Sequence, residues 1–219
     1  CLVLALAMFA LTWARWPQDG GSAGDDRPSG LTFSAALREV THLPLALRVL
    51  ALGAVNAAST VYMALLGLVL IPEVGRSTAD VALYAGLTAG LEVPFMLALP
   101  LVIGRMRRNT LILAGAVIYA THVVALPVLA GSPLLWVMIV PAALGGAVTL
   151  TLPIAYLQDM LAARPGAGSS LMALQKLSGD VIAAGCFVLG TTLSGYGLVA
   201  VLGGAVSIAG ATALLLADR

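Results

Sequence analysis

The sequence predicts an all-α membrane protein with six transmembrane helices that follow the end of an earlier helix. Hydrophobic residues make up 60% of the chain and charged residues only 10%, and the mean hydropathy is +1.03. These values lie far outside the range of soluble globular domains. Apolar runs long enough to cross a hydrocarbon core of about 30 Å also recur along the chain. Composition and apolar runs together predict that the protein lies in a bilayer.

Six apolar runs, separated by short polar loops, account for the predicted spans. They cover approximately residues 49–72, 81–104, 110–130, 134–157, 171–193 and 196–217. We therefore assign residues 46–219 to a six-helix transmembrane domain. Residues 1–14 are apolar too, but a helix of this length reaches only about 21 Å. We expect them to be the end of a truncated transmembrane helix, because neither an initiating Met nor the basic segment of a signal peptide precedes them.

Residues 15–45 form a predicted linker between this first helix and the six spans. Its segment "QDGGSAGDDRPSG" is rich in Gly, Ser, Asp and Pro and has too little apolar surface to fold alone. The following segment places Phe33, Leu37 and Val40 on one helical face. We expect a short amphipathic helix there, lying on the membrane surface.

The distribution of basic residues predicts the orientation of the chain. The linker contains three Arg residues and Arg48 follows it, the loop "GRMRRN" contains Arg105, Arg107 and Arg108, and the loop after the fourth span contains Arg164. Loops on the other side contain only Arg76. Because cytoplasmic loops carry the excess of Lys and Arg, we expect the linker and the C-terminus to face the cytoplasm from a cell membrane. Topology accounts for these charges, so they imply no nucleic-acid partner.

The few residues with catalytic or metal-binding chemistry form no recognisable motif. Cys1 and Cys186 cannot form a metal cage, and neither His42 nor His122 has a Cys, Asp or Glu at ligand spacing. A buried Ser nucleophile would also need a convergent His base, and no motif indicates one. We expect a protein that is not an enzyme and that needs no metal or organic cofactor.

Charged residues inside the spans carry the most functional information. An ionised side chain at a helix centre costs about 2.5 to 3.5 kcal/mol, so it is expected to face protein or water. Lys176 and Asp180 lie one turn apart in the fifth span and could simply neutralise each other. Glu92 has only Thr88 and Met96 one turn away. It must therefore be protonated, reach a group on another helix, or face a cavity.

Neutral polar residues accompany these charges. Asn56 and Thr60 in the first span and Tyr156 in the fourth offer hydrogen bonds to hydroxyl groups. Gln158 and Asp159 are assigned to the cytoplasmic loop after the fourth span, where we expect them to cap or brace helix ends.

The stretches "AGLTAGLEVPFML" with "GRMRRN", and "LPIAYLQDMLAARPGAGSSL", resemble the eighth helix and its loop, and the tenth helix and its loop, of bacterial sugar efflux transporters of the major facilitator superfamily. The resemblance covers most of residues 62–193. It implies the six-helix C-terminal half of a major facilitator bundle, whose N-terminal six-helix half is missing here. It also implies efflux of sugars or related small solutes by alternating access, with the proton gradient as driving force.

In this interpretation a group of residues near the midplane forms the substrate and proton pathway. Its members are Glu92, Asp180, Lys176, Asn56, Thr60 and Tyr156. A multidrug exporter is an alternative, but it would favour a cavity rich in aromatic residues and Met, and aromatic residues make up only 5% of the chain. A second alternative is a membrane bundle that transports nothing, in which Glu92 and Asp180 would pack against fixed partners.

Overall fold

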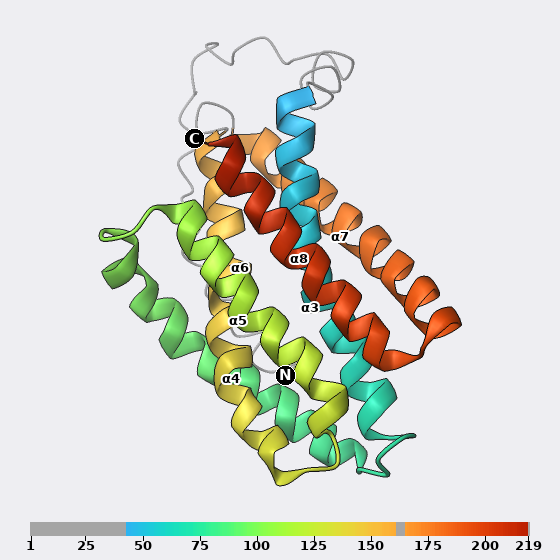
Figure 1. The fold of residues 1–219 in the computed structure, drawn as a ribbon. Coiled ribbons are helices and arrows are strands. Elements are labelled where there is room, and N and C mark those ends of the chain that lie inside the picture. Colours follow the sequence, from blue (N-terminus) through green and yellow to red (C-terminus); the bar gives the residue numbers. More distant parts are fainter. Residues whose placement is uncertain (1–42, 161–164, 219) are drawn as a thin grey trace, which may run out of the picture. The chain divides into compact units, whose positions relative to one another are not determined.

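The computed structural model describes residues 43–160 and 165–218, and the side chains of 43–160 and 171–218. The expected truncated helix, the linker helix and Arg164 lie outside these residues. Within them the chain is helical throughout, without strands (Figure 1), which confirms the predicted all-α class. The elements are α3 (Leu43–Leu70), α4 (Thr78–Ile103), α5 (Arg108–Leu129), the 3-10 helix η1 (Pro133–Met138), α6 (Ile139–Met160), α7 (Pro165–Leu193) and α8 (Tyr196–Ala217).

Each predicted span corresponds to a helix that can cross a membrane. Six such helices occur in the described part of the chain, with η1 and α6 forming one continuous span. The protein is therefore a multi-pass membrane protein. One boundary differs from the prediction, because α3 begins at Leu43 and not near residue 49, so the predicted linker cannot extend to residue 45.

Short turns connect α3 to α4 and α7 to α8. Ser77 caps α4: its hydroxyl accepts a hydrogen bond from the Asp80 N–H at 3.1 Å, and the Asp80 carboxylate accepts one from the Ser77 N–H at 3.1 Å. Gly195 precedes α8 with φ of 87°, a conformation that residues with a side chain rarely adopt. These turns hold consecutive helices antiparallel.

The helices pack as two interlocked triplets, α3–α4–α5 and α6–α7–α8. The first helix of each triplet packs against the second and third helices of the other: α3 against α7 and α8, and α6 against α4 and α5. The third helices, α5 and α8, also pack together, and Figure 1 shows α8 running alongside α5 and crossing α3. Because each triplet has an odd number of crossings, the second triplet traverses the membrane in the opposite sense to the first.

Equivalent helix pairs in the two triplets use glycine for close contact. A Cβ atom on Gly210 of α8 would lie 2.5 Å from the carbonyl oxygen of Ala51 in α3. A Cβ atom on Gly145 of α6 would lie 2.7 Å from the backbone nitrogen of Tyr119 in α5. Larger residues would force both pairs apart, so glycine sets the spacing of the central helices. By contrast, α4 and α7 are the least covered helices of the bundle.

Candidate functional site

Glu92 lies at the contact between α4 and α6. Its side chain is half-buried, and it is directed against the backbone of Gly146, where a Cβ atom would collide with the Glu92 carboxylate. Glycine at position 146 therefore creates the space that the carboxylate occupies. No ion pair or hydrogen bond joins this carboxylate to another residue in the described ranges. The residue before Gly146 in α6, Gly145, packs against Tyr119 of α5, so Glu92 also lies near Tyr119.

Asp180 lies at the contact between α7 and α3, and its carboxylate has two partners. The Thr60 hydroxyl donates a hydrogen bond to it at 2.9 Å, and the Lys176 ammonium lies 3.4 Å away. The pairing of Lys176 with Asp180, which their spacing predicted, is confirmed. Both side chains remain open, since 71% of the Lys176 surface and 42% of the Asp180 surface are exposed.

Asn56 completes this second polar group. A Cβ atom on Gly179, the residue before Asp180, would lie 2.9 Å from the Asn56 amide nitrogen. Asn56 and Thr60 of α3 are therefore next to the Asp180 segment of α7. Four of the six predicted pathway residues thus gather at one helix contact, while Glu92 lies at another.

The two contacts are equivalent positions of the two triplets. Asp180 follows Glu92 by 88 residues (180 − 92), and Tyr196, the first residue of α8, follows Arg108, the first residue of α5, by the same 88 (196 − 108). Glu92 lies where α4 meets α6, and Asp180 lies where α7 meets α3, which is the equivalent pair. The same offset puts Thr88 in the place of Lys176. Glu92 therefore has Thr88, and not a cation, one turn before it.

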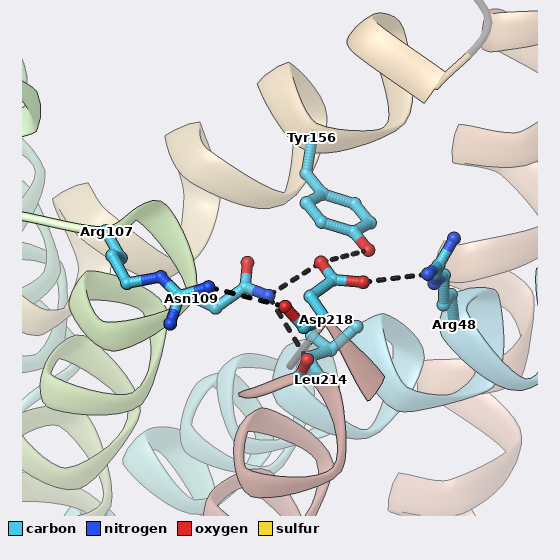
Figure 2. A network of polar contacts seen from close by, with 6 residues as sticks. All are labelled: Arg48, Arg107, Asn109, Tyr156, Leu214 and Asp218. Carbon is cyan, nitrogen blue, oxygen red and sulfur yellow. Dashed lines mark hydrogen bonds and ion pairs between the residues drawn. The ribbon is translucent and has the colours of Figure 1, made fainter. Parts of the chain in front are cut away.

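Tyr156 lies in a different polar network, which sequence reasoning missed. Its hydroxyl donates a hydrogen bond to the Asp218 carboxylate at 2.9 Å (Figure 2). Asp218 follows α8 directly and also accepts hydrogen bonds from Arg48 of α3 and Asn109 of α5, each at 2.8 Å. Figure 2 shows how Arg107 reaches the Asp218 backbone carbonyl, 3.4 Å from its guanidinium. Tyr156 therefore lies in neither the Glu92 group nor the Asp180 group, and no contact supports its predicted role in the pathway.

The Asp218 network stabilises an acid where the helix itself does not. The C-terminal end of a helix carries partial negative charge and disfavours a carboxylate. Burial likewise opposes ionisation of Asp218, but hydrogen bonds from Asn109 and Tyr156 and the charge of Arg48 outweigh it and hold the pKa of Asp218 below its usual value. An acid directly after the last apolar run was the signal in the sequence that could have revealed the network, because a carboxylate at a helix C-terminus requires hydrogen-bond donors or cations near it.

The predicted cytoplasmic loop residues lie closer to helices than expected. Gln158 and Asp159 belong to the last turn of α6, and Arg108 is the first residue of α5, so their assignment to loops was wrong. Neither Gly nor Pro interrupts the chain between Tyr156 and Met160, and the helix continues. Arg108 and Asp159 form an ion pair at 2.6 Å, which braces two helix ends as predicted for Asp159. Arg107 immediately precedes α5, and Arg105 lies in the turn before it.

A cavity adjoins Asp218 itself. It has a volume of about 220 Å³ and is lined by Arg107, Arg108, Asn109, Tyr156, Leu215 and Asp218. In the part of the chain that the structure describes, no cluster of three His, Cys, Asp or Glu residues could hold a metal ion. The groups that gather around Glu92 and Asp180 are carboxylates, hydroxyls, an amide and an ammonium. They can bind protons and hydrogen-bond a polar solute.

No protein-family model matches the chain, and neither a curated protein nor a solved structure is significantly similar to it.

Proposed function

We propose that the chain is a six-helix half of a secondary active transporter that exports sugars or related small solutes in exchange for protons. The sequence resemblance to the major facilitator superfamily motivates this proposal. The second six-helix half, in the same chain or another, would supply the opposite wall of the pathway. Solutes would then cross by alternating access, as the two halves rock around a site near the midplane.

The observation that carries the proposal is the placement of charged groups on the least covered helices. Glu92 and Asp180 occupy equivalent positions of two oppositely oriented triplets, on α4 and α7. Transporters with inverted repeats commonly bind substrates and coupling ions where the repeats meet. Lys176 and Asp180 are too exposed to face lipid without a large cost, so their side of the bundle must meet water or another protein surface. A solute pathway between two halves provides water and a second protein surface.

The two acids have different roles in this mechanism. Glu92 lacks a partner among the described residues, so it is free to take up and release the coupled proton. Asp180 is held by Thr60 and Lys176 and acts as a fixed hydrogen-bond acceptor for solute hydroxyl groups. Asn56 adds an amide that can both donate and accept hydrogen bonds. Short polar groups of this kind suit a hydroxylated solute better than a lipophilic cation.

The orientation follows from the Arg residues, as the sequence predicts, with Arg105, Arg107 and Arg108 facing the cytoplasm. In this orientation the Asp218 network lies at the cytoplasmic end of the bundle. The lipid of the cell membrane, a small solute and the second half are then the partners of the chain. Neither an enzymatic role nor a nucleic-acid partner is part of the proposal.

Solute flux in vesicles tests the proposal. The full-length protein is reconstituted, a pH gradient is imposed, and the movement of labelled mono- and disaccharides is compared with that of lipophilic cations. We expect saccharide flux that collapses when a protonophore removes the gradient. Flux of the cations alone would instead indicate a multidrug exporter. Absence of any gradient-driven flux would indicate a bundle that does not transport.

A further inference from the structure

A buried cluster of aromatic residues lies beside Glu92. His122 of α5 is at its centre, with its ring centroid 5.1 Å from that of Tyr62 in α3 and 6.2 Å from that of Tyr84 in α4. Tyr119 lies 6.0 Å from the same imidazole. On the far side of Tyr84, Trp136 of η1 lies 5.9 Å away. The cluster therefore joins four elements in the half of the bundle that contains η1.

The cluster contains polar atoms that lack protein partners. The Tyr62 hydroxyl, the Tyr84 hydroxyl and both ring nitrogens of His122 form no hydrogen bond with any described residue. Tyr84 and His122 are fully buried, and Tyr62 is 4% exposed. The Thr88 side chain comes close to the Tyr62 hydroxyl, but its own hydroxyl donates to the Tyr84 carbonyl at 2.9 Å. Four buried polar atoms thus remain without partners from the protein.

Packing alone does not account for these atoms. Buried polar side chains are nearly always hydrogen-bonded, and each exception requires an explanation. Phe or Leu would fill the same space without the cost of desolvating an unpaired hydroxyl or imidazole. The four atoms form a complementary set, because a neutral imidazole offers one donor and one acceptor and each phenol offers both. A buried water molecule needs two to four polar partners of this kind.

We propose that Tyr62, Tyr84 and His122 form a buried water-binding site that relays protons to Glu92. The structural part concerns water alone. The relay part rests on the proposed function: a proton arriving through the bound water is taken up at one His122 ring nitrogen, and another leaves from the second nitrogen towards Glu92. Each step breaks one N–H or O–H bond and forms another, so no other reactant is consumed.

The titratable groups around His122 are few. Tyr62 faces it from α3, Tyr84 faces it from α4, and Tyr119 lies on α5 itself. Glu92 lies two turns after Tyr84 on the same face of α4. The surrounding apolar core contributes Cys186 of α7 and Tyr196 of α8, while η1 contributes Trp136, which does not titrate. Glu92 is thus the one carboxylate near the cluster among these groups, and it is the natural end of a proton relay.

The sign of a stability change tests the water site. Tyr62→Phe and Tyr84→Phe each remove one hydroxyl and keep the ring. If the hydroxyl binds water, we expect Tm to fall by about 2–4 °C in each variant. If it is unpaired, its removal abolishes a desolvation cost and Tm rises. Tyr196→Phe, at a half-buried ring at the start of α8, is the matched control and should leave Tm unchanged.

NMR of the same protein provides a direct readout. With ¹⁵N-labelled His, the two imidazoles of the chain, His42 and His122, are distinguished by a His42→Gln variant. We expect magnetisation transfer between water and the His122 ring protons, with a changed His122 signal in Tyr62→Phe. Lack of transfer, together with a rise in Tm for both Phe variants, would overturn the water site.

Transport assays test the relay separately. His122→Gln retains a polar side chain that can hold water but cannot pass a proton between two ring nitrogens. In the full-length protein we expect pH-gradient-driven efflux to fall about tenfold, while solute exchange without net proton movement is retained. Unchanged gradient-driven efflux in His122→Gln would overturn the relay. If the unmodified protein moved no solute, the proposed function and the relay would fail together, and the Tm and NMR results would still decide the water site.

Discussion

Asp218 and Glu92 are two carboxylates in opposite environments. Asp218 accepts hydrogen bonds from Arg48, Asn109 and Tyr156, and it links α3, α5, α6 and α8. Glu92 lies in a space left by Gly146 and has no such partner in the described chain. A carboxylate whose hydrogen bonds are all formed stabilises one arrangement of helices, whereas an unpartnered one is available for protons or solute. The comparison separates an acid that stabilises the fold from an acid that the proposed function uses.

The largest effect is expected at Glu92. Glu92→Gln preserves the shape of the side chain and is cheaper to bury, so membrane expression should remain normal. Proton-driven efflux should fall at least tenfold, equivalent to about 1.4 kcal/mol in barrier height. Efflux and protein level are measured in the same cells. Glu73→Gln makes the same chemical change in an exposed turn and is the control. Normal transport by Glu92→Gln would show that Glu92 has no part in the mechanism. Glu92 and Asp218 would then not differ in function.

Asp218 should show the reverse pattern. Asp218→Asn weakens hydrogen bonds to a charged acceptor, and because the side chains of Arg48 and Asp218 are about 30% exposed, we expect a cost of about 1 kcal/mol. Tm should fall by about 2–4 °C while transport per folded molecule is retained. Asp159→Asn, in an ion pair whose acid is 65% exposed, is the control and should change Tm less. Transport loss without a change in Tm would make Asp218 a functional acid.

A smaller effect is expected at Lys176, the partner of Asp180. Asp180 is intermediate between Glu92, which has no partner among the described residues, and Asp218, which has several. Lys176→Gln removes the cation 3.4 Å from Asp180 but leaves the Thr60 hydrogen bond. Because Lys176 is mostly exposed, the pair contributes at most about 1 kcal/mol. Solute efflux should therefore fall less than about fivefold, with Tm almost unchanged. A loss as large as that of Glu92→Gln would show that Lys176 itself contacts the solute.

The smallest signal is the pH dependence of the Asp218 contribution. The pKa of Asp218 is lower in the folded protein than its unfolded value of about 3.9, so its stabilisation is fully present above that value. It is lost as pH falls through the lowered pKa. The Tm difference between the unmodified protein and Asp218→Asn should thus be constant near neutral pH and shrink below about pH 4. A difference that grew in acid would contradict the assigned direction.

The sequence was sufficient for features that lie within one helix. Apolar run length predicted all six spans, and i, i+4 spacing predicted the pair of Lys176 and Asp180. The same spacing indicated that Glu92 lacks a partner on its own helix. Contacts between helices were out of reach, because periodicity defines a face but not the helix that covers it. The space at Gly146 and the partners of Asp218 depend on such contacts.

Boundaries and buried neutral groups were also hard to predict. The polar residues after Tyr156 resemble a loop, yet α6 continues through Asp159, whose charge is neutralised by Arg108 on another helix. The sequence showed only that His122 has no Cys, Asp or Glu at ligand spacing. Its burial against Tyr62 and Tyr84 is evident only once three helices are assembled.

The interlocked triplets have a consequence for biosynthesis. During translation α3 enters the membrane long before its main neighbours, α7 and α8, have been made. The first three helices therefore cannot reach their final packing while the ribosome is still synthesising the second triplet, and close-contact surfaces such as that around Ala51 stay open. Assembly must wait for nearly the whole domain, so the last helices to emerge complete the bundle.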